Sequence, residues 1–274
     1  MTVIPRDAAT VILLREPKTD RGRGFEVLMA RRSSKSSFVP SSYVFPGGRV
    51  DEEDCRSGMI DFCNDSDIER VRETSDEMLH PEKKLGIWIA AIRETFEEMG
   101  LLFASRESDS LIKFQDTDEC AQRFAEYRKH IAEGRLRFAE MLHKEGLTLT
   151  LHRLFYFSRW ITPELSPKRY DTRFFIAEAP DCQEALHDGH ELTTHIWTTP
   201  GEALAHYRGN KFHMVVPTIV TLEELSRFDC ITNVIESTRG KKIKSVMTRL
   251  VFENDEIQEH APDGRIFRNL VASK

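Results

Sequence analysis

The sequence predicts an α/β fold for this chain. Two apolar runs, at 8–14 and 25–30, are typical of strands, and more strand-like runs follow beyond position 150. Between them, residues 82–99 place apolar side chains over a wide helical face. The 274 residues are 40% hydrophobic, which is enough for a buried core. No repeat or inter-domain linker is visible, so we expect one domain spanning 1–274.

The N-terminal elements lead to a glycine pair. The runs at 8–14 and 25–30 are expected to form a hairpin around the turn-like residues 18–24. A short strand at 43–45 then ends at Pro46-Gly47-Gly48. Paired glycines allow a backbone geometry and a close ligand approach that side chains would block.

Two insertions are expected in the middle of the chain. Residues 51–82 are acidic and low in aliphatic residues, and we interpret them as an insertion that is helical from 66 to 79. Pro81 is well placed to open the next helix. A second charged helical stretch, at 117–145, indicates an added helical segment over about 105–150.

The C-terminal part of the chain returns to strand patterns, at 154–160, 174–178 and 195–198. Helices are expected to follow, from 199 onward and at 218–228. The tail alternates weakly over 243–252 and, with the turn signal Asp263-Gly264, predicts a terminal hairpin.

Charge and cysteine content exclude several classes of protein. Lys and Arg total 39 against 45 acidic residues, giving a net charge of −6, so no global basic field draws the chain to nucleic acid or anionic membranes. The five cysteines are scattered without a Cys-x-x-Cys pair, which argues against a disulfide framework or structural zinc site. No apolar run approaches the roughly 18 residues of a membrane span. We expect a cytoplasmic protein that binds neither nucleic acid nor membrane.

Three glutamates provide the strongest chemical signal. Glu94, Glu97 and Glu98 stand at helical offsets of three and four, so their carboxylates project from one side of the helix. A Glu-rich helix is more often a solvated, salt-bridged face, but no cation follows these residues at i+4. We therefore expect unpaired carboxylates, mostly off the buried face, that suit a hard cation such as Mg²⁺.

The string Arg93-Glu94-Thr95-Phe96-Glu97-Glu98-Met99-Gly100-Leu101 resembles the second half of the Nudix box, a signature of hydrolases acting on nucleoside diphosphates linked to another moiety. The resemblance implies a Nudix pyrophosphohydrolase with an α/β/α sandwich and a mixed β-sheet, enlarged here by helical insertions. It also implies Mg²⁺ or Mn²⁺ as cofactor. The metal ligands would be Glu94, Glu97, Glu98 and the carbonyl of Gly48.

The same resemblance assigns catalytic roles. Glu94 would be a metal ligand or the base that activates water, while Glu97 and Glu98 would be ligands. Arg93 would ion-pair within the box and orient a glutamate, a role we prefer to direct phosphate contact.

The first half of the box departs from the family pattern of Gly, five residues, Glu, seven residues, Arg. Counting forward from Gly48 reaches Asp54, a shorter carboxylate, whereas counting back from Arg93 reaches Leu85, which cannot serve. The two counts disagree by about thirty residues, and this difference is the reason for placing an insertion at 51–82.

Further strings narrow the resemblance to the peroxisomal-type coenzyme A diphosphatases and their bacterial relatives, over residues 6 to about 225; they lie at 6–11, 45–51, 159–163 and 169–177. A stricter coenzyme A signature is kept in part. Its matching positions are Leu28, Arg32, Ser33 and 45–48, whereas Ser37 and Ser41 replace an expected Arg and Gly.

Several residues are expected to bind substrate. Arg31, Arg32 and Lys35 follow a strand and could reach a 3′-phosphate or diphosphate, although a solvated basic loop is an equal alternative. Phe45 and Gly47 belong to the matching signature. The remaining candidates for the pocket or a further carboxylate near the metals are Trp160, Arg173, Phe175 and Glu191.

The resemblance implies cleavage of coenzyme A or acyl-coenzyme A to 4′-phosphopantetheine, or its acyl form, and adenosine 3′,5′-bisphosphate. One alternative is hydrolysis of another nucleoside diphosphate conjugate, such as ADP-ribose, a dinucleotide or a nucleotide sugar. Another is a nucleotide-binding Nudix domain without catalysis. The expected partner is the small-molecule substrate, and a homodimer is an open possibility.

Overall fold

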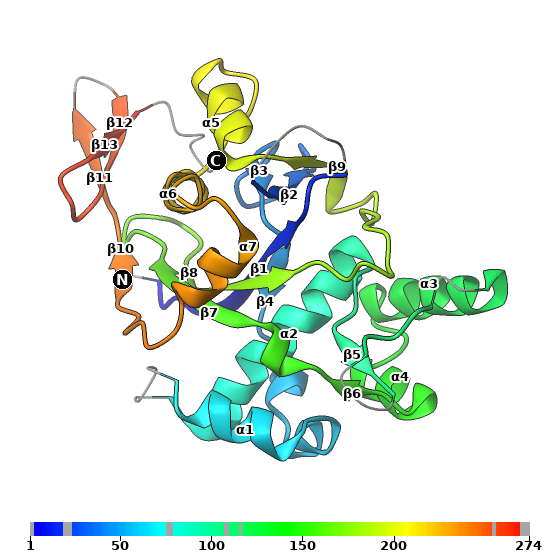
Figure 1. The fold of residues 1–274 in the computed structure, drawn as a ribbon. Helices are drawn as coiled ribbons and strands as arrows, with labels where there is room; N and C mark the ends of the chain where they lie inside the picture. The colour runs from blue at the N-terminus through cyan, green and yellow to red at the C-terminus, as the bar shows by residue number, and fades with distance from the viewer. Residues whose placement is uncertain are drawn as a thin grey trace.

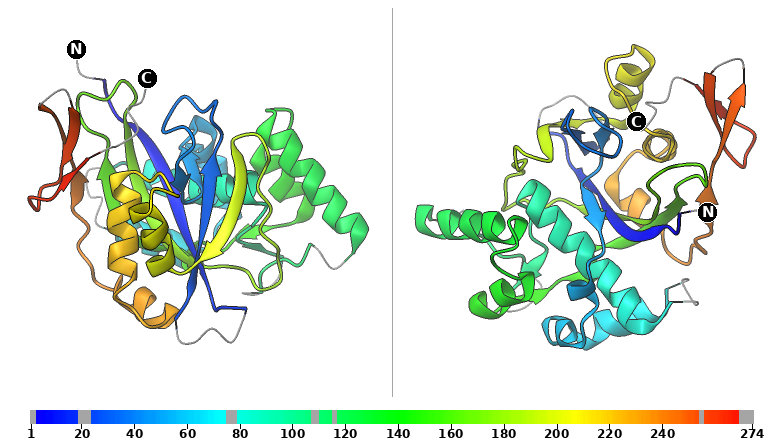
Figure 2. Two further views of the ribbon diagram at one scale, coloured as in Figure 1. Left: turned by 90° about the horizontal axis from the view of Figure 1, so that it is seen from above. Right: turned by 180° about the vertical axis from the view of Figure 1, so that it is seen from behind.

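A mixed β-sheet with helices on both faces forms the centre of the molecule (Figures 1 and 2). The computed structural model describes residues 3–18, 24–74, 79–106, 110–114, 117–253 and 256–268. Within this part of the chain the main sheet has eight strands, in the order β10-β7-β8-β1-β2-β3, with β4 attached to β1 and β9 to β2. The predicted α/β fold with a mixed sheet is confirmed.

The central strand of this sheet is β1 (Arg6–Arg15). It runs parallel to β8 (Tyr170–Glu178) and antiparallel to β2 (Glu26–Arg32) and β4 (Gly47–Arg49). The expected hairpin between β1 and β2 is present, while residues 19–23 of its turn lie outside the described residues. The other strands are β3 (Tyr43–Val44), β7 (Phe155–Ile161), β9 (Leu192–Thr198) and β10 (Ser245–Met247).

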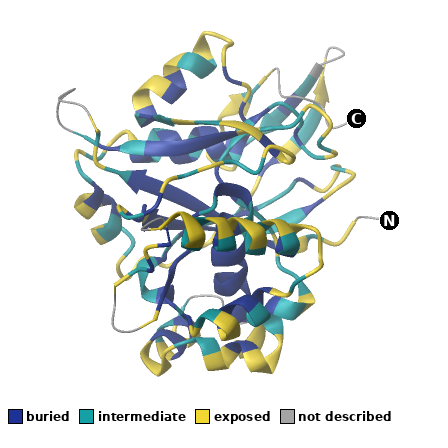
Figure 3. Cartoon of the chain, turned by 90° about the vertical axis from the view of Figure 1, so that its right-hand side faces the viewer, coloured by how far each residue is buried: buried dark blue, intermediate teal, exposed yellow. Residues whose placement is uncertain are grey.

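Alternate residues of β1 supply two hydrophobic cores. Ala9, Val11 and Leu13 face one core, and Ile12 and Leu14 face the other. This period of two follows from the pleat of a strand whose faces are both covered. The sheet therefore lies between two helical layers, and Figure 3 shows its buried strands in dark blue with exposed residues on the outer turns of the helices.

One face of the sheet is covered by α2 (Pro81–Met99), which Pro81 opens as expected. Gly100, with φ 67°, ends the helix in the left-handed region and donates its N–H to the carbonyl of Phe96. The ring of Trp88 packs on Phe175 of β8 at a centroid distance of 4.6 Å.

The segment between β4 and α2 contains two 3₁₀ helices, η1 (Glu52–Cys55) and η2 (Ser57–Phe62), and α1 (Asp65–Arg72). The expected helix over 66–79 is thus shorter and ends at Arg72, while residues 75–78 lie outside the described residues. Ile68 and Val71 of α1 join the core beneath α2.

The second predicted insertion contains two helices instead of one continuous stretch, because Gly134, at φ 67°, lies where the chain turns between them. These are α3 (Asp118–Ala132) and α4 (Phe138–Glu145), flanked by the paired short strands β5 (Ala104–Ser105) and β6 (Thr148–Leu149). Phe124 and Phe138 anchor the helices in the core that α2 also lines.

The opposite face of the sheet carries α5 (Pro200–Arg208), α6 (Val216–Leu225) and α7 (Ile231–Glu236), of which α7 was not anticipated. A capping box of Thr199 and Glu202 starts α5.

The C-terminal strands include the expected terminal hairpin within a larger arrangement. β10 joins the main sheet parallel to β7, and β11 (Arg249–Glu253), β12 (Glu256–His260) and β13 (Ile266–Phe267) form a separate sheet. The Asp263-Gly264 turn connects β12 to β13. Across the described ranges, every helix is too short or too polar to cross a membrane.

Candidate active site

The glycine pair brings backbone directly against α2. Gly47 and Gly48 pair with Thr10 and Ala9 of β1. A Cβ on Gly47, whose φ is 150°, would lie 2.3 Å from the carbonyl oxygen of Ala9. A Cβ on Gly48 would lie 2.5 Å from the carboxyl carbon of Glu94. Gly47 therefore allows β4 to lie closely against β1, and Gly48 allows the β4 backbone to approach the helix.

The three glutamates of α2 lie beneath this glycine pair. Glu98 is only 4% exposed, and its Oε2 accepts a hydrogen bond of 2.7 Å from the N–H of Gly47. The side chains of Glu94 and Glu97 are 14% and 18% exposed. The expectation that the glutamates lie mostly off the buried face is wrong for Glu98, because β4 covers this turn of the helix.

Arg93 is buried among these carboxylates. Its Nη1 donates to Oε1 of Glu94 at 3.0 Å and to Oε1 of Glu97 at 2.9 Å, and its Nη2 donates to the carbonyl of Arg49 at 2.9 Å. The expectation of unpaired glutamates is therefore wrong for two of the three. Arg93 precedes Glu97 by four residues, whereas the prediction considered only a cation that follows the glutamates.

Asp54 is a further residue of the candidate site, although its shorter side chain departs from the glutamate that the family pattern has at this spacing. It is 3% exposed, and its two carboxylate oxygens accept hydrogen bonds from Nε and Nη2 of Arg93, both at 2.9 Å. The N–H of Asp51 also donates to Asp54, at 2.8 Å. The signal was its spacing from Gly48. By this spacing, Asp54 corresponds to the expected first glutamate. Although a long segment separates it from Arg93 in the sequence, the two side chains are in contact.

The electrostatics of the glutamates favour a bound cation. Burial raises the pKa of Glu94 to about 7, against the attraction of Arg93 and with added repulsion from Glu97. Burial also raises the pKa of Glu98 well above its usual value, and repulsion from Glu94 and Glu191 raises it further. Burial alone would lower the pKa of Arg93, but its ion pairs with these acidic residues raise it.

The donor set fits a hard divalent cation. Among the described residues, no three acidic, histidine or cysteine side chains converge closely enough to enclose an ion. However, Glu94 and Glu98 are buried carboxylates whose mutual repulsion a cation would relieve. The carboxylate of Glu94 occupies the place that a side chain at Gly48 would take, so it lies directly against the backbone of Gly48. Oxygen donors of this kind suit Mg²⁺ or Mn²⁺.

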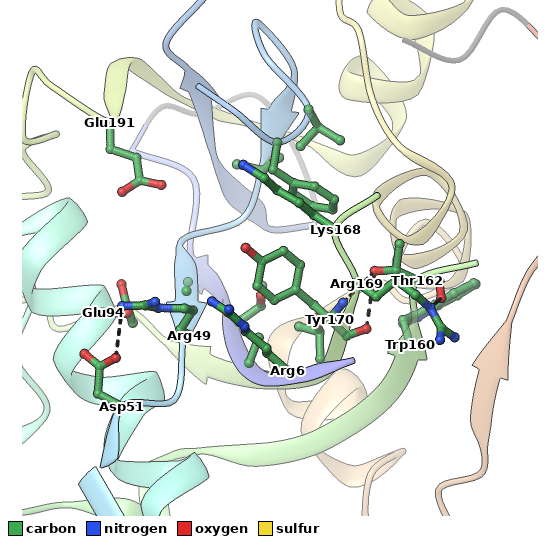
Figure 4. Close-up of a pocket in the computed structure, with 18 of the residues that line it drawn as sticks. Arg6, Arg49, Asp51, Glu94, Trp160, Thr162, Lys168, Arg169, Tyr170 and Glu191 are labelled. Atoms are coloured by element: carbon green, nitrogen blue, oxygen red, sulfur yellow. Dashed lines mark hydrogen bonds and ion pairs between the residues drawn. The ribbon is translucent and has the colours of Figure 1, made fainter. Parts of the chain in front are cut away.

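Glu191 lies at the same end of the cavity, above Glu94 in the view of Figure 4. It forms an ion pair of 2.5 Å with Nη2 of Arg32. Arg31, by contrast, is exposed and does not line the cavity, which corrects its assignment to substrate binding. Successive strand residues point to opposite sides, so only one of two adjacent arginines reaches the cavity.

The cavity itself has a volume of about 1600 Å³ and lies over one face of the sheet. Its floor is formed by alternate residues of β1 and β8 and by Trp160 of β7, and Phe45 and Gly47 line its wall. The strand residues are Ala8, Thr10, Thr172 and Phe174. Arg173 falls on the opposite face of β8, where its Nη1 pairs with Oδ1 of Asp7 at 2.6 Å. Its assignment to substrate binding is therefore corrected. Phe175 is likewise fully buried in the core beneath α2.

The chain is similar to several known proteins. A family model described as the NUDT19 Nudix domain matches residues 5–227. The acyl-coenzyme A diphosphatase NUDT19 of Xenopus laevis is 29% identical over 231 residues, covering 74% of this chain and 60% of that protein. The protein of the same name from Gallus gallus is 26% identical over 275 residues, covering 83% of this chain and 70% of that protein.

Among solved structures, a NUDIX hydrolase from Alicyclobacillus acidocaldarius matches with a TM-score of 0.65 and 26% identity, covering 86% of this chain and 97% of that one. The curated relatives are longer, and the chain spans only 60% of the Xenopus protein.

Proposed function

The chain belongs to the Nudix family, and on that premise we propose that it is a divalent-metal-dependent hydrolase that cleaves the diphosphate of coenzyme A or acyl-coenzyme A. The products would be 4′-phosphopantetheine, or its acyl form, and adenosine 3′,5′-bisphosphate. The observation that carries the proposal is the buried cluster of Glu94, Glu97 and Glu98 beside Gly48, at one end of a cavity large enough for such a substrate.

The chemistry follows from the charge of the diphosphate. Mg²⁺ or Mn²⁺, held by the three glutamates and the carbonyl of Gly48, would neutralise the non-bridging oxygens. Water then adds to one phosphorus, the bond from that phosphorus to the bridging oxygen breaks, and the proton lost by the water is taken up by a base. Burial raises the pKa of Glu94 to about 7, which suits it to accept that proton, and ligation of the metal is its alternative role.

Arg93 would position the cluster without touching substrate. It is held from one side by Asp54 and from the other by Glu94 and Glu97. Because a guanidinium donates in fixed directions, these bonds orient the two glutamates toward the cavity. Glu191 adds a carboxylate at the same end, as its repulsion of Glu98 indicates.

A substrate panel tests the proposal. Purified protein with Mg²⁺ or Mn²⁺ is incubated with coenzyme A, ADP-ribose, NADH and nucleotide sugars, and the products are resolved by mass. We expect adenosine 3′,5′-bisphosphate from coenzyme A and little cleavage of the others. Cleavage of the other conjugates instead would overturn the substrate but keep the reaction, and inactivity toward the whole panel would favour a non-catalytic nucleotide-binding domain.

A further inference from the structure

Several basic side chains outside the glutamate cluster line the cavity, and three of them lie near Tyr170 in Figure 4. Arg6 is the first residue of β1, Arg49 is the last residue of β4, and Lys168 precedes β8. In Figure 4, Arg6 and Arg49 lie between Glu94 and Tyr170, with Lys168 above them. The register of the sheet explains this grouping, because Arg6 pairs with Tyr170 and Arg49 pairs with a β1 residue two positions after Arg6.

These cations are poorly neutralised. Among the described residues, no ion pair or side-chain hydrogen bond engages Arg6 or Lys168, and Arg49 has only an exposed contact of 3.3 Å with Asp51. The neighbouring Arg169 is different, because it is buried and donates to the backbone carbonyls of Val3 and Thr162. Positive charge gathered beside a cavity in a chain of net charge −6 favours an anionic ligand group.

Aromatic rings adjoin the cations. The rings of Phe38 and Tyr170 meet edge to face at a centroid distance of 5.0 Å, and both residues line the cavity with Trp160. Such rings offer surfaces on which a purine base can stack. An aromatic wall beside a basic cluster is suited to a nucleoside that carries its own phosphate.

We propose that Arg6, Arg49 and Lys168 form a subsite for a phosphate monoester, which selects substrates bearing a 3′-phosphate on the adenosine half. The inference rests on the proposed function, which places the diphosphate at the glutamates. It assigns the remaining phosphate of coenzyme A, a monoester with close to two negative charges at neutral pH. It also moves 3′-phosphate recognition from Arg31, which does not line the cavity, to three residues that do.

The expected effect is on selectivity. A charge-assisted hydrogen bond to phosphate corresponds to about tenfold or more in binding. We therefore expect wild-type protein to have a kcat/KM for coenzyme A at least about tenfold above that for dephospho-coenzyme A. In an Arg6→Gln/Lys168→Gln double variant this ratio should approach one, through loss of activity on coenzyme A alone.

The control is an Arg208→Gln/Lys211→Gln double variant, which removes the same two charges from exposed positions outside the cavity. It should keep the wild-type ratio. Calorimetry in a metal chelator adds a readout without turnover, with adenosine 3′,5′-bisphosphate and AMP as probes. The bisphosphate should bind more tightly to wild-type and control protein, and this preference should disappear in the Arg6→Gln/Lys168→Gln variant.

Two outcomes would overturn the subsite while leaving the proposed function intact. The first is an unchanged ratio in the Arg6→Gln/Lys168→Gln variant. The second is an equal loss on both substrates, which would mean that these cations hold the diphosphate. If wild-type protein cleaves neither substrate, the proposed function fails, and calorimetry still decides the subsite, since equal binding of bisphosphate and AMP would refute it.

Discussion

Replacing Glu94 by Gln should stabilise the metal-free protein at alkaline pH. Burial raises the pKa of Glu94 from 4.5 to about 7. Between these values the folded protein holds a proton that the unfolded chain releases, so the contribution of Glu94 to stability is complete below pH 4.5 and is lost as the pH rises through 7. The difference between the two pKa values corresponds to about 3 kcal/mol.

Glutamine cannot ionise, yet it keeps an oxygen that accepts the hydrogen bond from Nη1 of Arg93. The Glu94→Gln variant should therefore exceed the wild type in free energy of unfolding by up to about 3 kcal/mol at pH 8, and by little at pH 4.5. Added Mg²⁺ should stabilise the wild type at pH 8 and the variant much less, because the variant lacks one of the anionic ligands.

Urea unfolding in a metal chelator measures this effect at both pH values. Glu126→Gln is a matched control, because it removes the charge of an exposed glutamate on α3 and should leave stability almost unchanged. If Glu94→Gln is less stable than the wild type at pH 8 in the chelator, then burial of the ionised Glu94 carboxylate does not destabilise the protein as we infer.

Three further substitutions test the site. Glu98→Gln should lower kcat by about a hundredfold or more, with an unchanged circular dichroism spectrum, and near-normal activity would refute its role as a ligand. Gly48→Ala places a methyl group 2.5 Å from the carboxyl carbon of Glu94, so it should abolish turnover, and a fully active variant would contradict the close approach. Asp54→Ala removes both acceptors of the hydrogen bonds from Nε and Nη2 of buried Arg93 and leaves a cavity, so it should reduce the free energy of unfolding by about 3 kcal/mol in urea titrations. A loss below about 0.5 kcal/mol would show that the pair contributes little.

Much of the fold could be predicted from local patterns. The amphipathic run of α2, with proline at its start and glycine at its end, is a strong local signal, and the hairpin of β1 and β2 follows from two apolar runs around a turn. Pairing between distant strands leaves no such signal. The parallel contact between β1 and β8 joins residues more than 160 positions apart, and the short strand β10 acquires its place only by pairing with β7.

Contacts between residues that are distant in sequence also limited the prediction of the candidate site. The spacing of the glutamates placed them on one side of α2, and their pairing with Arg93 of the same helix is also local. The contact of Arg93 with Asp54, by contrast, depends on the packing of η1 against the helix. Arg173 was misassigned because both faces of β8 are covered, so its alternation does not reveal which side borders the cavity. Arg6 and Arg49 are distant in sequence, and only the sheet register brings them together.

The ion pair between Asp54 and Arg93 also bears on how freely this part of the chain can vary in length. It closes a loop between residues separated by 39 positions, whereas the family pattern has only seven residues between the corresponding pair. The entropy of closing a flexible loop grows with the logarithm of its length, so this expansion costs about 1.4 kcal/mol. A buried, bidentate ion pair can offset a cost of that size. The chain can therefore make this long excursion while the ion pair keeps Arg93 in place beside the glutamates.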